Sequence, residues 1–339
     1  MATTRKVVIS AFGDASNLAV VSAPMPAPAR NEVQVAVVYS GFSGADVNMR
    51  LGWYPMQRAA PLTPGYCFVG RVAANGPGSS RFAPGAVVAA VTVYDAQSEL
   101  VNIPEKHLVP VPQGVGLQTA CALPLDWNSA YGMVMRTASV SAGQRVFVHG
   151  LSGAVGYAVM ALCQLQGAVV YGTASQRNHD ELRRLGAHPF VYTDKAWIGE
   201  MQALGGAHAV FDPLGFESYD ESYAILCTAA PSRLVGYGGN LTALTGGKRR
   251  HWLPYVLKLM LRNAAVWSSK ATSFYYISRD DKNFQPDLAA LMNLAQEGRV
   301  QVPIKHVWAL DDIREAHESW GKLHGMGSIL VRVSDDATA

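Results

Sequence analysis

The sequence has no long apolar run and little charge of either sign. Charged residues make up 16% of its 339 residues, and the formal net charge is +3. The apolar stretch WLPYVLKLML (252–261) is interrupted by Pro254 and Lys258, and nothing reaches the roughly 18 apolar residues that a membrane-spanning helix needs. The basic run 248–250 is short and is best interpreted as a solvated loop. We therefore expect neither nucleic acid nor a membrane as a partner.

Cysteines are few and far apart. The four of them, at positions 67, 121, 163 and 227, are too widely spaced for a disulfide framework or a CxxC metal site, so we expect buried, reduced thiols. The opening MATTRKVVIS passes straight into an alternating strand pattern, without the apolar stretch of about 7–15 residues that marks a secretory signal. We interpret the chain as an unprocessed cytoplasmic protein.

The length and the hydrophobic content favour two domains, since 339 residues that are 49% hydrophobic exceed what one core usually supports. The first third is rich in strand patterns separated by Pro and Gly turns, which indicates a barrel-like β domain. From about residue 120 strand and helix patterns alternate, which is typical of a doubly wound parallel sheet in an α/β fold. We predict a β-rich domain over 1–120 and 301–339 and a nucleotide-binding domain over 121–300.

A glycine-rich turn stands at the head of the second domain. In RVFVHGLSGAVG (145–156), a β-branched strand is followed by Gly150, Gly153 and Gly156 and then by an apolar helix. In this context the glycines permit a tight turn, close approach of backbone N–H groups to a pyrophosphate, and close packing of the helix on the strand. The GxxGxxG spacing is weak evidence by itself, because an ordinary strand-to-helix turn also explains it. The strand-to-helix context favours a dinucleotide.

The acidic residue expected about 20 residues after the first glycine, where it would bind the ribose 2′-hydroxyl of NAD, is missing. The second strand pattern ends in GTA and continues with Ser175, Gln176 and Arg177. A hydroxyl and a guanidinium suit a 2′-phosphate, which a carboxylate would repel. The sequence therefore predicts NADPH as cofactor, although an exposed loop arginine is the alternative reading of Arg177.

These motifs, together with SGFSGADVNMRLGWYP (40–55) and PGYCFVGRV (64–72), resemble the medium-chain dehydrogenase/reductase superfamily over nearly the whole chain. The similarity is greater to the quinone oxidoreductase and enoyl reductase branch. The resemblance implies a GroES-like β-barrel domain joined to a Rossmann domain, with the substrate bound where the two domains meet.

The resemblance also implies that no catalytic zinc is present. Zinc-dependent relatives carry a Cys after the first long strand and a GHE motif, and the corresponding positions here hold Ser43 and Gly65-Tyr66-Cys67. A structural zinc lobe with four cysteines has no counterpart, because no cysteine lies between 67 and 121. The nine histidines are scattered, whereas zinc needs about four N or S ligands. Hydride addition to a conjugated acceptor is then favoured over reduction of a simple carbonyl.

Cofactor contacts follow from the resemblance where residues match. Ser175, Arg177 and Tyr192 occupy the adenosine phosphate end, and Ala154 and Val155 continue the glycine loop. FDPLG (211–215), VGYGG (235–239) and SFYYI (273–277) end strands that pass the nicotinamide, and GMGSILV (325–331) matches a C-terminal hairpin near the cofactor. From these segments we expect contacts from Leu214, Gly236, Tyr237, Phe274 and Tyr275. Ser43 replaces the Asn common in the GxNxxD motif of the branch, and we include it as a candidate contact.

For the proton donor and for the aromatic wall of the substrate site, the sequence offers several candidates. Hydride transfer to an enone leaves an enolate that must be stabilised at oxygen and protonated at carbon, and Tyr54 and Tyr66 are the candidate donors. Trp53 and Trp127 are candidates for an aromatic wall, with a core role as the alternative. Asp126 stands where the family often has Asn, and both a capping and a catalytic role are open.

The sequence thus predicts an NADPH-dependent reductase of α,β-unsaturated carbonyl compounds or quinones that works without zinc. Two alternatives remain open: a trans-acting polyketide enoyl reductase, and a protein that binds NADPH without turnover, as is thought of some homologous vesicle and lens proteins. The apolar segment AAVWSSKATSFYY (264–276) predicts a sheet edge through which a homodimer forms.

Overall fold

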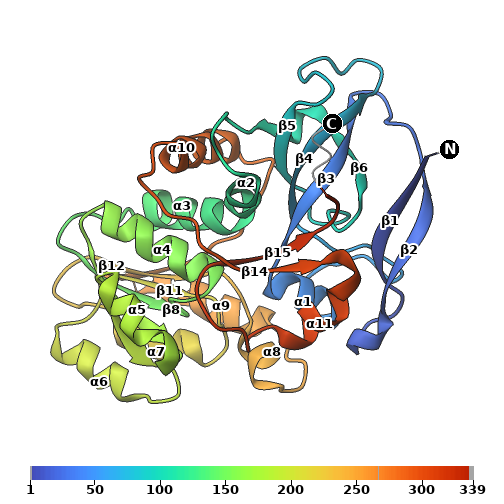
Figure 1. Cartoon of the computed structure of the whole chain (residues 1–339). Coiled ribbons are helices and arrows are strands. Elements are labelled where there is room, and N and C mark those ends of the chain that lie inside the picture. The colour runs from blue at the N-terminus through green and yellow to red at the C-terminus, as the bar shows by residue number, and fades with distance from the viewer. Residues whose placement is uncertain (1, 266, 336–339) are drawn as a thin grey trace. The chain divides into compact units, whose positions relative to one another are not determined.

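A computed structural model describes residues 2–265 and 267–335, which fall into two compact units (Figure 1). Unit 1 takes in the chain up to residue 128 together with 278–323 and the segment from 328 onward, and unit 2 takes in 129–277 and 324–327. Residues 121–128 and 278–300, which the sequence analysis assigns to the nucleotide-binding domain, lie in unit 1. They are tied there by hydrogen bonds such as Asn128 Nδ2 to Phe284 O (3.2 Å) and Gln296 Nε2 to Gln113 O (2.8 Å).

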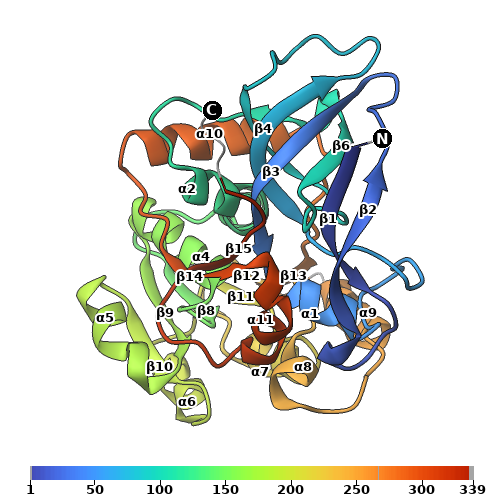
Figure 2. The ribbon, with the colours of Figure 1, turned by 45° about the vertical axis from the view of Figure 1, so that its right-hand side comes forward.

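Unit 1 is built on a seven-stranded sheet with the order β14-β15-β3-β4-β5-β7, in which β6 also pairs with β3. Along β3, Val33, Val35 and Val37 are fully buried and alternate with less buried residues, as expected when one face of a strand meets the core. A separate hairpin of β1 and β2 lies beside β6 (Figures 1 and 2). The strands are β1 (Ala2–Ile9), β2 (Leu18–Met25), β3 (Glu32–Phe42), β4 (Cys67–Asn75), β5 (Val87–Val91), β6 (Leu100–Pro104), β7 (Val109–Pro110), β14 (Ile304–Ala309) and β15 (Ser328–Arg332).

The C-terminal strand β15 pairs with β3 through Ile329–Phe42 to Arg332–Tyr39, so the end of the chain returns to the β-rich unit as the sequence predicts. The helical elements of unit 1 are η1 (Ala15–Asn17), α1 (Gly44–Arg50), η2 (Glu105–His107), α2 (Leu117–Ala122), the π-helix η3 (Leu123–Trp127), α10 (Phe284–Gln296), η7 (Leu310–Asp312) and α11 (Ile313–Ser319). The helix α3 (Asn128–Tyr131) begins at the boundary with unit 2, where a second π-helix, η4 (Gly132–Thr137), follows it.

Unit 2 contains a six-stranded sheet with the order β10-β9-β8-β11-β12-β13, in which every pairing is parallel. The chain runs outward from β8 to β10, returns to β11 and continues to β13, which is the doubly wound arrangement predicted from the sequence. Its strands are β8 (Arg145–His149), β9 (Val169–Ala174), β10 (His188–Val191), β11 (Ala209–Asp212), β12 (Ser232–Gly236) and β13 (Lys270–Phe274). Its other helical elements are α4 (Ala154–Leu165), η5 (Gln176–Asn178), α5 (His179–Arg184), α6 (Ala196–Ala203), α7 (Ser218–Ala224), α8 (Leu241–Thr245), α9 (Leu253–Leu261) and η6 (Arg262–Ala264).

The α/β fold class with a parallel sheet is therefore confirmed. All four cysteines are buried and none is in a disulfide. Within the described parts of the chain, no helix has both the length and the apolar character needed to cross a membrane.

Candidate functional site

The candidate cofactor site is the carboxyl edge of the parallel sheet in unit 2. A doubly wound sheet binds ligands beyond the carboxyl ends of its strands, next to the point where the strand order reverses. Here that point lies at β8, which has β9 on one side and β11 on the other. Every residue of unit 2 that the sequence analysis assigns to the cofactor lies at this edge.

The glycine turn joins β8 to α4. Gly150 has φ of +74°, in the left-handed region that a side chain disfavours. A Cβ on Gly156 would lie 2.1 Å from the carbonyl oxygen of Gly150, so only glycine lets α4 approach the turn this closely. Gly153 is the N-cap of α4, and it has no side chain that could accept a hydrogen bond from the first turn of the helix. The first-turn N–H groups of Ala154, Val155 and Gly156 have no acceptor within the helix, and the positive end of the helix dipole is directed at this turn.

The adenosine phosphate end is predicted where β9 and β10 finish. These strands pair in register up to Ala174 and Val191, so Ser175 and Tyr192 each follow the end of a neighbouring strand. Ser175 is half-buried and makes no side-chain cap of η5, Arg177 is exposed, and Tyr192 is 57% exposed. A hydroxyl, a guanidinium and a phenol thus stand at two adjacent strand ends.

The nicotinamide end is predicted at β11, β12 and β13. Asp212, Gly236 and Phe274 are matched in register across these three strands. Asp212 accepts hydrogen bonds from Leu214 N (2.7 Å) and Gly215 N (3.2 Å), and its carbonyl oxygen accepts from Tyr237 N (3.0 Å). Tyr275 N donates to Gly236 O (2.8 Å). Leu214, Gly236, Tyr237, Phe274 and Tyr275 therefore share the edge that the glycine turn occupies.

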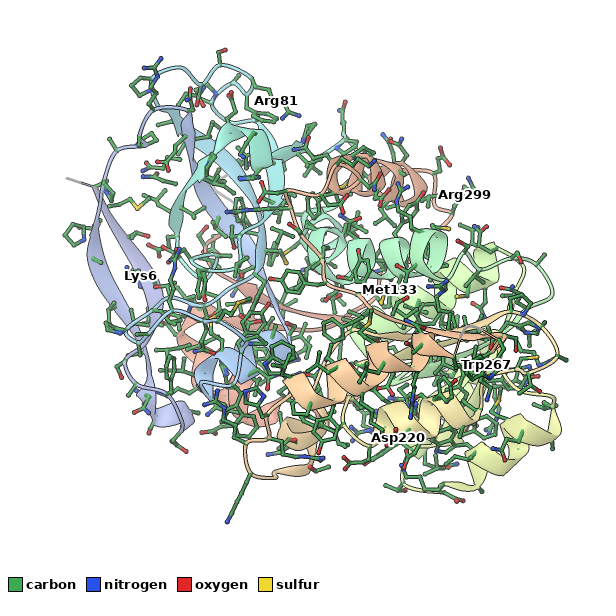
Figure 3. All side chains as sticks on the ribbon, turned by 180° about the vertical axis from the view of Figure 1, so that it is seen from behind. Lys6, Arg81, Met133, Asp220, Trp267 and Arg299 are labelled. Atoms are coloured by element: carbon green, nitrogen blue, oxygen red, sulfur yellow. The ribbon has the colours of Figure 1, made fainter. Side chains whose placement is uncertain are left out.

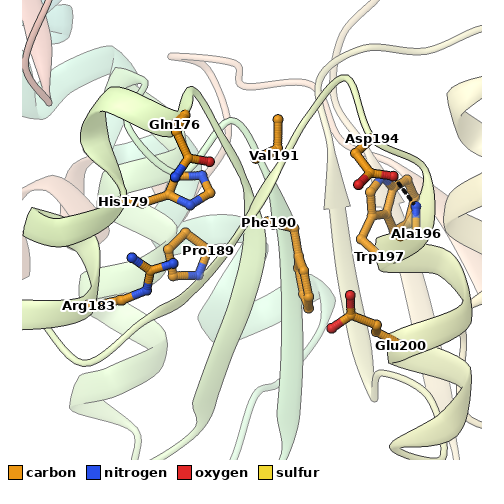
Figure 4. Close-up of a pocket in the computed structure, with 10 residues that line it drawn as sticks. All are labelled: Gln176, His179, Arg183, Pro189, Phe190, Val191, Asp194, Ala196, Trp197 and Glu200. Carbon is orange, nitrogen blue, oxygen red and sulfur yellow. Dashed lines mark hydrogen bonds between the residues drawn. The ribbon is translucent and has the colours of Figure 1, made fainter.

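A pocket of about 210 Å³ borders the adenosine phosphate end (Figure 4). Gln176, His179 and Arg183 line one side of it, and Asp194, Trp197 and Glu200 line the other, with Pro189, Phe190 and Val191 of β10 between them. The sequence analysis did not predict this pocket, because its residues come from β10 and from helical segments on either side of it that only the folded sheet edge brings together. It adjoins the turn without including Ser175, Arg177 or Tyr192 in its lining.

The candidate donors lie in unit 1. Tyr66 directly precedes β4 and is 3% exposed, and its ring centre is 5.4 Å from that of the half-buried Tyr54. Among the described residues, the Tyr66 hydroxyl has no hydrogen-bond partner. Burial, with Tyr54 and Asp46 close by, raises the pKa of Tyr66 well above its usual range. The group is therefore a neutral phenol, and it packs within the hydrophobic core of unit 1.

Asp46 is bonded to the backbone next to this tyrosine. The sequence analysis gave Asp46 no role. It is fully buried and accepts hydrogen bonds from Ser43 N (2.9 Å), Gly65 N (3.1 Å) and Gln97 Nε2 (3.4 Å). Burial raises the pKa of Asp46 to about 7. Because Gly65 is bonded to Tyr66 along the chain, Asp46 ties the start of α1 to the backbone of the candidate donor. The signal in the sequence was the acidic residue at the third position after Ser43, as in a capping box.

The remaining predicted residues of unit 1 have structural partners. Ser43 is the N-cap of α1, and its hydroxyl accepts from Ala45 N (3.2 Å). Trp53 is half-buried in the turn after α1, whereas Trp127 is 1% exposed inside η3, and this burial favours its core alternative. Asp126 caps no helix: it is buried and accepts from Ser328 Oγ (2.6 Å), and burial raises its pKa to about 6.

The positions at which related enzymes hold zinc are occupied by a poor set of ligands. The Ser43 hydroxyl is engaged as a helix cap, and the neighbouring Cys121 and burial raise the pKa of the Cys67 thiol well above its usual value. Zinc binds the deprotonated thiolate. Within residues 2–265 and 267–335, no group of three or more His, Cys, Asp and Glu side chains is arranged to hold a metal ion.

Two family models match the chain. Residues 29–113 match the model described as alcohol dehydrogenase GroES-like domain, and residues 185–331 match the model described as zinc-binding dehydrogenase.

Among curated proteins, the chain is 26% identical to a synaptic vesicle membrane protein VAT-1 homolog of Danio rerio, over 97% of this chain and 70% of that protein. It is 29% identical to the medium chain reductase pydE of an Acremonium species, over 89% of both chains. It is also 26% identical to quinone oxidoreductase-like protein 2 of Bos taurus, over 89% of this chain and 85% of that protein.

Solved structures share the fold. A quinone oxidoreductase from Coxiella burnetii superposes with a TM-score of 0.83 at 20% identity, over 98% of this chain and all of that chain. A mycobacterial protein complexed with NADPH superposes with a TM-score of 0.84 at 22% identity, over 97% of this chain and 99% of that one.

Proposed function

We propose that this chain, which belongs to the medium-chain dehydrogenase/reductase superfamily, is an NADPH-dependent reductase of activated C=C bonds or quinones. The two family models and the similarity to quinone oxidoreductases and to a protein complexed with NADPH support an oxidoreductase with a nicotinamide cofactor. The observation that carries the finer proposal is the row of matched residues along one sheet edge, which has a hydroxyl, a guanidinium and no carboxylate in the turn 175–177 after β9, and a phenol directly after β10.

The residues at this edge fit a dinucleotide. The left-handed turn at Gly150 and the close approach at Gly156 leave the uncapped start of α4 open to a pyrophosphate. We assign the 2′-phosphate to Ser175, Arg177 and Tyr192, and the nicotinamide half to the segments that begin at Leu214, Tyr237 and Tyr275. When bound, NADPH supplies the hydride. Reduction then requires a group that stabilises the charge developing on the acceptor oxygen.

We assign that role to Tyr66. Its buried hydroxyl makes no hydrogen bond of ordinary geometry within the described chain, with Tyr54 as its polar neighbour, and it stays protonated at neutral pH, so it can donate to an enolate oxygen. The contact between the rings of Tyr54 and Tyr66 and the link from Asp46 to Gly65 hold the phenol in place. Tyr54 is the second candidate, because it is less buried and stands beside it.

We propose further that the reaction proceeds without zinc, because the residues at the former ligand positions do not fit the ion. Conjugate addition spreads negative charge into an enolate, for which one or two hydrogen bonds suffice, whereas an isolated alkoxide calls for a stronger electrophile. Elemental analysis tests this part of the proposal. We expect no stoichiometric zinc and full activity in chelator, and one zinc per chain that is lost together with activity would contradict it.

The similarity over 97% of the chain to VAT-1 homologs, which are named as synaptic vesicle membrane proteins and not as reductases, favours one alternative of another class, a protein that holds NADPH without turnover. Saturable NADPH binding and steady oxidation of NADPH with a panel of enones and quinones, including acyl thioesters of the polyketide type, separate the two. We expect turnover with at least one class of acceptor. Binding with no oxidation across the panel would support the alternative.

We also propose a cytoplasmic homodimer that forms through β13. This strand is at the edge of the unit 2 sheet, and edge strands invite a partner strand, although the Asn263 side chain already binds the backbone N–H and carbonyl of Thr272 (2.8 and 2.9 Å). Exposed apolar side chains gather in the segment that leads to it, namely Leu253, Leu257, Met260, Leu261 and Trp267. Trp267, labelled in Figure 3, is 85% exposed. Val266 of the predicted edge segment lies outside the described residues.

A further inference from the structure

A line of buried side chains connects the glycine turn to the loop after β11, and the proposed function has no role for it. The line runs from Thr173 at the end of β9 through His149 at the end of β8 to Ser222 on α7 and Asp212 at the end of β11. All four are 3% exposed or less. The successive distances are 3.4 Å from Thr173 Oγ1 to His149 Nδ1, 3.0 Å from His149 Nε2 to Ser222 Oγ, and 2.7 Å from Ser222 Oγ to Asp212 Oδ2.

The protons on this line have one consistent direction. Asp212 receives four donors, which are Leu214 N, Gly215 N, Ser218 Oγ and Ser222 Oγ. Since the Ser222 proton is given to Asp212, the Ser222 oxygen must accept a hydrogen bond from His149 Nε2. Burial lowers the pKa of His149 and keeps the imidazole neutral, so Nδ1 carries no proton.

The other end of the line follows from this tautomer. An unprotonated Nδ1 accepts the hydroxyl proton of Thr173, and Thr173 Oγ1 in turn accepts from Gly150 N (3.2 Å). The line therefore begins on the backbone of the first glycine and ends on the carboxylate that holds the N–H groups of Leu214 and Gly215. Hydrogen bonds aligned in one direction in a buried site strengthen one another.

We propose that His149 is a positioning residue that couples the glycine turn to the 213–215 loop, so that the segment assigned to the pyrophosphate and a segment assigned to the nicotinamide half are held in one arrangement. This inference rests on the proposed function for the identity of the ligand. It adds that affinity for NADPH depends on an unbroken line and not only on residues that contact the cofactor.

The simpler interpretation is that His149 is a core residue whose hydrogen bonds only pair its buried ring nitrogens. His149 packs edge-on against Phe147 and Trp197, with ring centres 5.1 and 5.2 Å away, and such packing stabilises the fold whether or not a ligand binds. The two readings differ in what a broken hydrogen bond does. A packing role lowers the free energy of unfolding alone, whereas a coupling role also weakens NADPH binding.

Two serines of α7 offer a matched comparison. Ser218 and Ser222 are both buried, and each donates to Asp212 Oδ2 at 2.7 Å, but only Ser222 continues to His149. We expect Ser222→Ala to raise the NADPH dissociation constant about three- to tenfold, the size of one hydrogen bond, and Ser218→Ala to change it less than twofold. Both should lose similar stability in urea unfolding without ligand. Equal effects of the two serines on NADPH affinity would overturn the proposal.

A double-mutant cycle tests whether the line acts as a unit. Thr173→Val and Ser222→Ala break it on opposite sides of His149, and Thr173→Ser keeps the hydroxyl. We expect each break to weaken NADPH binding, the double variant to bind within about twofold of the weaker single variant, and Thr173→Ser to bind like wild type. Effects that multiply, or single variants that bind normally, would contradict coupling. A wild-type protein that binds no NADPH would overturn the proposed function, and the inference with it.

A spectroscopic readout stays informative if a variant folds poorly. The ¹⁵N and ¹H spectrum of histidine-labelled wild type, with His149 assigned from the signal missing in His149→Gln, should show a neutral ring protonated at Nε2. A ring protonated at Nδ1, or a charged ring at neutral pH, would overturn the direction of the line and the proposal built on it.

Discussion

We propose that Arg177 and its neighbours at the ends of β9 and β10 determine which nicotinamide cofactor the sheet edge suits. A guanidinium contact to phosphate contributes on the order of 1.5–3 kcal/mol, so Arg177→Ala should weaken NADPH binding about ten- to a hundredfold. NADH binding should be nearly unchanged, because NADH lacks the 2′-phosphate. Arg184→Ala, which removes another exposed arginine of unit 2, is the matched control in a fluorescence titration. Equal affinity of the wild type for both cofactors would contradict the assignment.

Tyr66 offers an unusual separation of stability from catalysis. Its hydroxyl is buried without a partner in the described structure, so Tyr66→Phe should leave the free energy of unfolding unchanged or raise it, since burying an unpaired polar group is unfavourable. With saturating NADPH, kcat should fall roughly 10²–10³-fold if the hydroxyl contacts the developing oxyanion. The same substitution at Tyr54 should have a smaller effect. If neither variant loses tenfold in kcat, water or the substrate supplies the proton and both tyrosines only line the site.

At the scale of residues, the sequence predicted which residue types occupy the candidate site better than it predicted which residues surround them. The missing acid after Ala174 and the tyrosine in place of a zinc ligand are visible in the letters. The sequence does not reveal that the Tyr66 hydroxyl lacks a hydrogen-bond partner among the described residues. It does not reveal the line through His149 either, because Thr173, Ser222 and Asp212 are brought to His149 only by the strand order. Trp127 was proposed as a substrate wall, but its depth inside η3 depends on packing that no local pattern reveals.

At the scale of elements, the junction of β8 and α4 is sensitive to a single methyl group. A Cβ at Gly156 would lie 2.1 Å from Gly150 O, whereas a Cβ at Gly199 in α6 would meet nothing within 4 Å. We expect Gly156→Ala to lower the free energy of unfolding by about 1–3 kcal/mol and to weaken NADPH binding. Gly199→Ala should be neutral or stabilising by up to about 1 kcal/mol. Urea unfolding of both variants measures this, and equal stabilities would contradict the close approach.

The elements themselves were largely predictable, because the alternation of strand and helix patterns after residue 120 allows few arrangements other than a parallel sheet. The return of the C-terminal segment to the β-rich unit was also visible as a late strand pattern. The two π-helices, η3 and η4, were not, since no simple residue signal marks the extra residue in a helical turn. The pocket beside β10 depends on the spacing of α5 and α6 across an edge strand, which sequence periodicity does not encode.

At the scale of the whole molecule, we expect a homodimer at micromolar concentration, because β13 is an edge strand and the apolar residues that lead to it are exposed. Light scattering of the wild type should give twice the chain mass of 36.3 kDa. Trp267→Glu should shift the equilibrium toward monomer by placing a charge in the interface, while Tyr192→Glu, at an exposed site elsewhere in unit 2, should not. A monomeric wild type would contradict this arrangement.

The reaction class is tested most directly by identifying the product of one turnover. The wild-type protein is incubated with NADPH and an enone, in which either the C=C bond or the conjugated carbonyl can be reduced. The products are identified by mass spectrometry and NMR. We predict the saturated ketone, formed in equal amount to the NADPH oxidised. An allylic alcohol with the double bond intact would contradict the account, because hydride would then have reached the carbonyl carbon.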